Sequence, residues 1–202
     1  MGLVSRLLAP GLFGAELRDA GQPVTLDRQE AALMAKAGEK RRRDFALGRA
    51  CAHAALAQLG RDTASIAIGE GGAPSWPLGI LGSITHTQGY AAAIVAEAKF
   101  FTGLGVDAER IGGVTQELWP RLFAPAERDY LTACKADQAM MATLFFSAKE
   151  ACYKAWGMSG GLPFRDIQIA PQKAGFRAER SGAVLQGHYC VQDDLMLTAV
   201  WF

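Results

Sequence analysis

Each half of the 202-residue chain pairs one long helix-forming segment with strand-forming segments, and this repetition constrains the fold more than any other feature. Helical spacing of apolar residues predicts one helix over Glu39–Leu59 and another over Asp137–Trp156. Apolar runs predict strands over Tyr90–Glu97 and Phe100–Glu109. We therefore expect an α+β protein of two similar-sized lobes that meet near Ala98–Thr102.

Shorter elements are predicted from local signals. Asp27 and Glu30 have the spacing of a capping box, in which Asp27 accepts backbone N–H groups and Glu30 reaches back to the cap, at the start of a helix to about Ala37. Pro125 suits the first turn of a further helix, because no N–H partner is needed there. Beyond the second long helix, glycines separate predicted strands, the last being Leu195–Phe202.

The charge of the chain is almost balanced, with 21 Lys+Arg, 20 Asp+Glu and a formal net charge of +1. Proteins that coat nucleic acid usually carry a large basic excess, so the balance argues against that class. The longest apolar stretch, Tyr90–Ala96, is far shorter than the roughly 20 residues that span a bilayer. Four isolated cysteines favour buried thiols in a reducing compartment. We expect a cytoplasmic protein with neither nucleic-acid nor membrane partners.

An acidic motif, Gly103–Glu109, closes the second predicted strand. Alternate side chains of a strand share a face, so Asp107 and Glu109 point the same way. Two neighbouring carboxylates repel each other, and a divalent cation such as Mg²⁺, which takes oxygen ligands, would relieve the conflict. A solvated strand end is the commoner role of such a pair, so this motif alone leaves both interpretations open.

A second polar group lies on the second long helix. Glu150 and Lys154 are one turn apart, with Ser147 near them, on the side opposite the apolar residues. Those apolar residues are Met141, Leu144, Phe145, Ala148, Cys152 and Ala155. An exposed Glu–Lys pair is the simple alternative. Three bulky aromatic residues flank the pair, and a merely solvated face needs none: Phe146, Tyr153 and Trp156.

Together, four segments resemble the motifs of the 4′-phosphopantetheinyl transferase family. Two are the segments just described, Val106–Glu109 and Ser147–Lys154. Upstream, Gly48–Leu56 resembles the arginine-bearing helix of the family, and Pro74–His86 contains its P-x-W-P and G-S-I-T-H motifs. The four occur in family order, and the layout is most similar to the two-lobe, broad-specificity type represented by enterobactin synthetase component D.

The resemblance implies a pseudo-twofold monomer whose active site lies at the interface of two α+β lobes, residues 1–100 and 101–202. Such enzymes bind coenzyme A and Mg²⁺, or Mn²⁺, between the lobes. They transfer the 4′-phosphopantetheine arm to a serine of an apo acyl-, peptidyl- or aryl-carrier protein and release adenosine 3′,5′-bisphosphate. Siderophore, nonribosomal peptide and polyketide pathways use such carriers. An attacking serine on the partner also explains why this chain shows no convincing nucleophile of its own.

The resemblance also assigns the catalytic group. Asp107, Glu109 and Glu150 match the metal-binding carboxylates. Glu150 is the expected base for the incoming serine hydroxyl, and Lys154 the expected phosphate contact that stabilises the leaving group.

Coenzyme A binding is assigned in the same way. His86 matches a histidine that touches the coenzyme phosphates, with Ser83 and Thr85 as hydrogen-bond donors beside it. Arg49 matches the arginine that binds the 3′-phosphate, and Arg41 is our choice among three adjacent arginines for a second such contact. Lys149 is expected to be a weaker phosphate contact.

Three points stay open in the sequence. Many relatives carry a basic residue just before the P-x-W-P segment, whereas this chain has Glu70–Ala73 there, which motivates a non-catalytic coenzyme- or carrier-binding relative as the alternative. Nucleic-acid binding by the arginine-rich helix is a third hypothesis, disfavoured by the charge balance. Carrier docking is expected on exposed apolar residues: Leu118, Trp119, Leu122 and Phe123.

Overall fold

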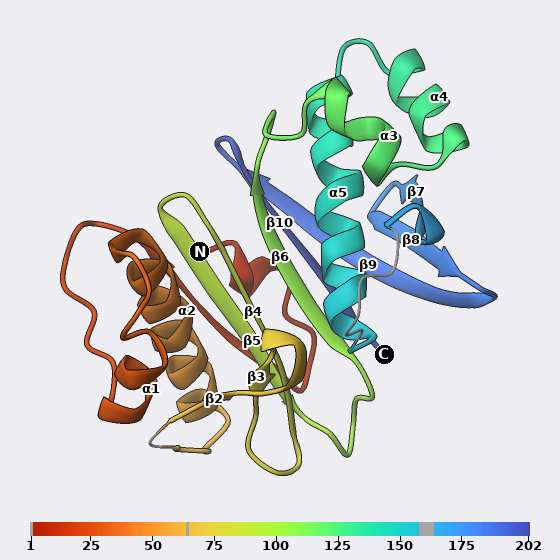
Figure 1. Cartoon of the computed structure of the whole chain (residues 1–202). Coiled ribbons are helices and arrows are strands. Elements are labelled where there is room, and N and C mark those ends of the chain that lie inside the picture. Colours follow the sequence, from red (N-terminus) through yellow and green to blue (C-terminus); the bar gives the residue numbers. More distant parts are fainter. Residues whose placement is uncertain (1, 64, 158–163) are drawn as a thin grey trace.

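A computed structural model describes residues 2–63, 65–157 and 164–202 of the chain. Two antiparallel sheets lie between two long helices, α2 and α5 (Figure 1). The elements of the first half that build its sheet and cover it are β1 (Leu12–Arg18), α2 (Glu39–Gln58), β4 (Ile80–Thr87) and β5 (Tyr90–Glu97). Those of the second half are β6 (Leu104–Arg110), α5 (Gln138–Ala155), β7 (Gln168–Gln172), β8 (Gly175–Arg180), β9 (Ala183–Gln192) and β10 (Leu195–Trp201).

The two halves repeat one topology. In the first, the strand order is β1-β5-β4, so the first strand pairs with the last and the last with its predecessor. In the second the order is β6-β10-β9-β8-β7, which begins with the same arrangement. A long helix follows the first strand in each half. Sequence similarity is not needed for this repeat, because the pattern of a strand, a helix and a hairpin is the same in both halves.

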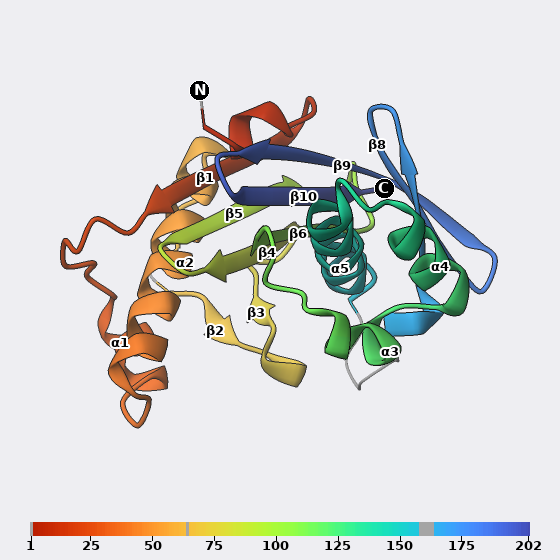
Figure 2. The same cartoon turned by 90° about the horizontal axis from the view of Figure 1, so that it is seen from above.

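The sheets and helices form four layers, with α2 outside one sheet and α5 outside the other (Figure 2). Strand β5 shows how the layers are built. Its residues Ala91, Ala93 and Val95 pack in the cluster under α2, whereas Tyr90 and Ile94 face the second sheet. Both faces of β5 are therefore covered by protein, which explains why this segment is apolar throughout.

Strand β10 has the same two-sided burial in the second half. Met196 and Val200 pack under α5, and Leu195 and Leu197 lie in the core between the sheets. That middle core also contains Leu3 and other residues of the N-terminal segment. The two lobes consequently share one of their hydrophobic cores.

Strands β4 and β6 lie side by side where the two sheets meet. Two hydroxyl groups join them: the backbone N–H of Val106 donates to Ser83 Oγ at 3.1 Å, and the N–H of Ala108 donates to Thr85 Oγ1 at 2.9 Å. The residue between the two donors is Asp107. This seam fixes the predicted carboxylate at the boundary of the lobes.

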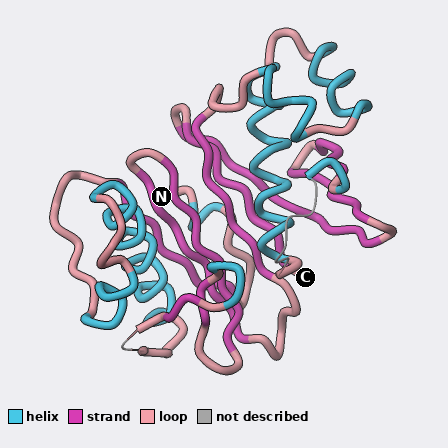
Figure 3. Tube along the Cα trace, in the orientation of Figure 1, coloured by secondary structure: helices cyan, strands magenta, loops and turns pink. Residues whose placement is uncertain are grey.

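Short elements surround the four layers (Figure 3). They are the helices α1 (Arg28–Leu33), α3 (Trp119–Leu122) and α4 (Pro125–Ala133), the small strands β2 (Ala67–Ile68) and β3 (Pro74–Ser75), and the 3-10 turns η1 (Val4–Arg6), η2 (Glu70–Gly72), η3 (Gln116–Leu118) and η4 (Phe164–Asp166). Across the described residues, no helix combines the length and apolarity required to cross a membrane.

The main elements agree with the sequence predictions: both long helices end within one residue of their predicted limits, and β5 has its predicted bounds. Two boundaries were wrong. The strand predicted from Phe100 begins at Leu104, because Phe100 N–H bonds to Glu97 O in a turn. The first helix ends at Leu33, and although Asp27 caps it as predicted, the side chain of Glu30 turns into the protein instead of reaching back.

Candidate active site

Close packing of β6 against α5 creates the polar site at the seam. A Cβ atom at Gly105 would collide with the carbonyl oxygen of Ala151, so only glycine allows this approach. The strand carries Asp107 and Glu109 in its second half, and the helix carries Glu150. Glycine in the acidic motif is thus what allows carboxylates from two distant segments to meet.

Asp107 is the most constrained of the acidic residues. It is 5 % exposed, and its Oδ1 accepts hydrogen bonds from Lys154 Nζ at 2.8 Å and from Thr85 Oγ1 at 3.2 Å. Lys154 Nζ also donates to Val106 O at 2.9 Å. Asp107 Oδ2 is buried and has no hydrogen-bond partner. An orphaned carboxylate oxygen in the interior is costly and marks a place for an additional cation or donor.

Electrostatic strain extends to the other two carboxylates. Burial, followed by repulsion from Asp107, raises the pKa of Glu109 to about 7. Burial also raises the pKa of Glu150, and the attraction of Lys154 opposes that shift. Mutual repulsion together with the orphaned oxygen fits a hard divalent cation, because carboxylate oxygens are the ligands that Mg²⁺ takes. The carboxylate oxygens of Asp107, Glu109 and Glu150 do not all lie within 4.8 Å of one another. In this arrangement the positive charge beside Asp107 comes from Lys154, whose Nζ pairs with Oδ1.

A cavity of about 610 Å³ opens between the lobes, and of the three carboxylates Glu150 lines it. Glu150, Tyr153 and Lys154 line it from α5, and Ser83 lines it from β4. The turn η2 and Trp76 form another part of its wall. The ring of Trp76 lies so close to Gly82 that a Cβ there would overlap it, which explains why the sequence pairs this tryptophan with a glycine.

A second cavity, of about 710 Å³, lies between α2 and β4, and we call it the basic cavity. Lys40, Arg41, Arg49 and His86 line it together with the acidic Glu39 and Asp44, and Asp44 pairs with Lys40 at 2.7 Å. The pKa of His86 is lowered, first by partial desolvation, although its side chain is exposed overall. The two cavities adjoin each other, and together we call them the groove. The residues that line both are Gly72, Pro74 and Ile84.

Neighbouring arginines of α2 separate into two environments. Arg41 lines the basic cavity, whereas the guanidinium of Arg43 is held by Asp19 on the far side. That pairing lowers the pKa of Asp19 to about 2. Lys40 also lines the cavity and was missed by the sequence prediction, although its position at the start of the basic run could have indicated it.

The family of the chain follows from its similarity to known proteins. Residues 29–96 match the model of the 4′-phosphopantetheinyl transferase N-terminal domain, and residues 103–200 match that of the 4′-phosphopantetheinyl transferase superfamily. The chain belongs to the 4′-phosphopantetheinyl transferases.

Named relatives support the assignment. The chain is 41 % identical to the 4′-phosphopantetheinyl transferase Npt of Nocardia iowensis over 155 residues, 76 % of this chain and 69 % of Npt. It is 37 % identical to PptT of Mycobacterium tuberculosis over 209 residues, 92 % of this chain and 90 % of PptT. With enterobactin synthase component D of Escherichia coli it shares 32 % identity over 170 residues, 83 % and 80 % of the two chains.

In this transferase, Lys149 does not face the groove. Its side chain is 0 % exposed, and Nζ donates to Glu127 Oε2 at 2.6 Å, to Leu122 O at 3.0 Å and to Phe164 O at 3.0 Å. Burial lowers its pKa, and Glu127 opposes that shift. All three protons of the ammonium group are thus used inside the protein, and the geometry leaves no donor for a phosphate.

The hydroxyls predicted to bind coenzyme phosphates are also engaged. Thr85 accepts from Ala108 and donates to Asp107, which uses its proton within the seam. Ser83 accepts from Val106 and lines the first cavity. These contacts give both residues a structural part in holding β4 against β6.

An apolar cavity of about 430 Å³ touches the carboxylates at Glu109. Leu118, Leu122, Phe146 and Phe164 line it, and Arg121 stands at its wall. The sequence expectation for a docking surface was half wrong, because two of its four residues lie in the core under α5. They are Trp119, 7 % exposed, and Phe123, 0 % exposed.

Proposed function

We propose that this transferase moves the 4′-phosphopantetheine arm of coenzyme A onto the serine hydroxyl of an apo carrier protein. The observation that carries the proposal is the groove, which joins a basic cavity on α2 to the carboxylates and Lys154 at the seam. Coenzyme A has matching chemistry: a 3′-phosphate at one end of its nucleotide and a pyrophosphate at the other. The basic cavity suits the former and the seam the latter.

The chemical step is a displacement at phosphorus. The serine Oγ forms a bond to the phosphorus that bears the pantetheine arm, and the bond from that phosphorus to the bridging oxygen breaks. The electron pair leaves with adenosine 3′,5′-bisphosphate. Glu150 accepts the serine proton, because burial raises the pKa of this carboxylate above its usual value and makes it a stronger base.

Lys154 and the carboxylates handle the charge that develops. The ammonium of Lys154, which lines the cavity, donates to the departing phosphate oxygen. Asp107, Glu109 and Glu150 would hold Mg²⁺, or Mn²⁺, which supplies neutralisation of the pyrophosphate charge. The orphaned Oδ2 of Asp107 supports this assignment.

The missing basic residue before the P-x-W-P segment has a substitute in the groove. Turn η2, which contains Glu70, lines both cavities, and Lys40 and Arg41 face the same basic cavity from the opposite side. We assign the 3′-phosphate, which lies beyond the reacting pyrophosphate, to Lys40, Arg41, Arg49 and His86. The retention of Asp107, Glu109 and Glu150 favours catalysis over the non-catalytic alternative.

The carrier enters on the apolar side of the carboxylates. Leu118 and Leu122 line the cavity that touches Glu109, and they offer apolar surface to an acyl-, peptidyl- or aryl-carrier domain. Both lobes that bind coenzyme A belong to one chain, which supports action as a monomer. All four cysteines are free thiols, which supports a reducing, cytoplasmic location.

A panel assay tests the proposal. The protein is incubated with coenzyme A and Mg²⁺ and with apo carriers from siderophore, peptide, polyketide and fatty-acid systems, and each carrier is weighed by mass spectrometry. We expect one phosphopantetheine unit on at least one carrier, and none after chelation of the metal. No gain on any carrier, with coenzyme A binding that ignores Mg²⁺, would instead establish the non-catalytic relative.

A further inference from the structure

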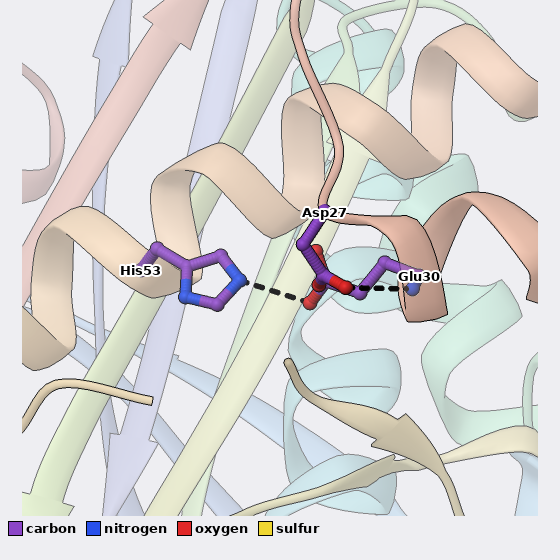
Figure 4. A group of neighbouring side chains, drawn as sticks. All are labelled: Asp27, Glu30 and His53. Carbon is purple, nitrogen blue, oxygen red and sulfur yellow. Dashed lines mark hydrogen bonds and ion pairs between the residues drawn. The ribbon is translucent and has the colours of Figure 1, made fainter. Parts of the chain in front are cut away.

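A buried acidic cluster lies behind the basic cavity, at the start of α1 and the middle of α2. Asp27, Glu30 and His53 converge there (Figure 4). Glu30 is 1 % exposed, and its Oε1 is 2.9 Å from His53 Nε2, accepts from the backbone N–H of Ile66 at 2.9 Å, and lies 3.6 Å from Arg49 Nε. None of these three acidic and imidazole groups lines the groove.

The cluster has the composition of a metal site, since its three ligand atoms lie within 4.8 Å of one another. The guanidinium of Arg49 argues against that role. It already stands as the counter-charge of Glu30, and a divalent cation on the same oxygen would be repelled by it. The carboxylate thus has His53 and the Ile66 N–H as hydrogen-bond partners, and Arg49 is the permanent cation beside it.

Arg49 is an incompletely satisfied cation. It is buried, its Nε has no hydrogen bond, and Nη2 makes one long bond of 3.4 Å to Ala67 O. The ring of Phe45 packs on one face of the guanidinium, 4.4 Å away. Desolvation lowers the pKa of Arg49, and Glu30 opposes that shift. A guanidinium held on three sides and lining a cavity is oriented for an anion that enters the cavity.

Resting on the proposed function, we infer that Glu30 is a positioning residue: it holds Arg49 in the orientation that recognises the 3′-phosphate of coenzyme A. Glu30 touches no substrate. The negative charge of Glu30, 3.6 Å from Nε, offsets the missing solvation of Arg49 and attracts the guanidinium toward its side of the cavity wall. Without the carboxylate, Arg49 would still be present but would be free to rotate away from the phosphate.

Glu30→Gln tests the inference, because it keeps an acceptor oxygen for Ile66 and removes the charge. Donors are coenzyme A and 3′-dephospho-coenzyme A, which differ only in the 3′-phosphate. We expect the variant to lose roughly tenfold of the preference for coenzyme A, through KM, with kcat and the KM for the dephospho donor unchanged. In an Arg49→Gln background, Glu30→Gln should have no further effect on the preference.

A matched control is Asp19→Asn, which also removes the carboxylate partner of an α2 arginine, Arg43, outside the groove. It should leave the kinetics of both donors unchanged. If Glu30→Gln does not fold by thermal denaturation, Glu30→Asp, which withdraws the charge by one methylene, gives the same comparison with a smaller loss.

Four results would overturn the inference. One is an equal loss with both donors in a folded variant, which would make Glu30 merely structural. A second is a wild type without preference between the donors. A third is stabilisation by Zn²⁺ that is lost in Glu30→Gln. If the wild type transfers from neither donor, the proposed function fails, and Glu30 is then tested by binding alone. Calorimetry measures the affinities of wild type and variant for adenosine 3′,5′-bisphosphate and for AMP, which lacks the 3′-phosphate. The fourth contrary result is that the variant binds each nucleotide with the same affinity as the wild type.

Discussion

At the scale of single residues, the site depends on carboxylates whose charge is incompletely compensated. Asp107 shows this most clearly, with one oxygen bound by Lys154 and Thr85 and the other buried without a partner. Such an arrangement costs stability unless a ligand completes it. Function therefore explains a feature that folding alone would disfavour.

Asp107→Asn should abolish transfer. The amide keeps the shape but removes the charge that faces Lys154 and the metal, so kcat should fall by about 10³-fold. Steady-state transfer to a carrier measures this, with Asp193→Asn, an exposed carboxylate far from the groove, as the control. Undiminished turnover in the folded variant would remove Asp107 from the active site.

Glu109 predicts a pH dependence of metal binding. Because its pKa is raised to about 7, the protonated form prevails below that pH in the metal-free protein. Metal must displace this proton, so the affinity for Mg²⁺ should fall as pH decreases through 7, by up to about tenfold per pH unit. Calorimetry in buffers of different ionisation enthalpy counts the released proton. A pH-independent affinity between pH 6 and 8 would contradict the assignment.

At the scale of elements, Lys149 joins α5 to three segments around it. Its ammonium binds the end of α3, the turn η4 and Glu127, whose other oxygen accepts from Ile169 N–H at 2.8 Å. Lys149→Met should lower the free energy of unfolding by about 3–5 kcal/mol, because Glu127 is left buried without its partner. Urea denaturation measures the loss. A variant of normal stability with a raised KM for coenzyme A would restore Lys149 as a phosphate contact.

Contact between β6 and α5 is tested by Gly105→Ala. The added methyl group meets the backbone of Ala151, which cannot rotate away, so we expect a loss of about 1–3 kcal/mol or more in stability together with reduced activity. Gly69→Ala is the matched control, since a Cβ there makes only ordinary contacts, the closest at 3.5 Å. Equal stability of the two variants would show that the close approach is not required.

At the scale of the whole molecule, the lobes share the core between their sheets. Leu12 and Ile94 of one half pack there with Val106 and Leu197 of the other. We predict a single cooperative unfolding transition, and no cooperative transition for residues 1–100 or 101–202 expressed alone. Calorimetry of the three chains tests this. An isolated half that unfolds cooperatively would show that the lobes are independent domains.

The sequence could predict those parts of the fold and of the site that depend on interactions between residues close together in the chain. Periodicity and apolar runs are local, so the limits of α2 and α5 were predicted to within one residue and those of β5 were predicted correctly. The environments of Glu30 and Lys149 depend on residues that are distant in sequence, such as Ile66 and Glu127, and no spacing rule reports them. The sequence neighbours of a charged residue in a helix do not indicate whether its side chain is buried in the core.

The central claim is that the enzyme transfers the 4′-phosphopantetheine arm to a serine of another protein. Tandem mass spectrometry of one apo carrier, after incubation with coenzyme A, Mg²⁺ and the transferase, tests this directly when the released nucleotide is quantified in the same sample. We predict phosphopantetheine on a single serine and an equal amount of adenosine 3′,5′-bisphosphate. An unmodified carrier, or an arm attached to the transferase itself, would contradict it.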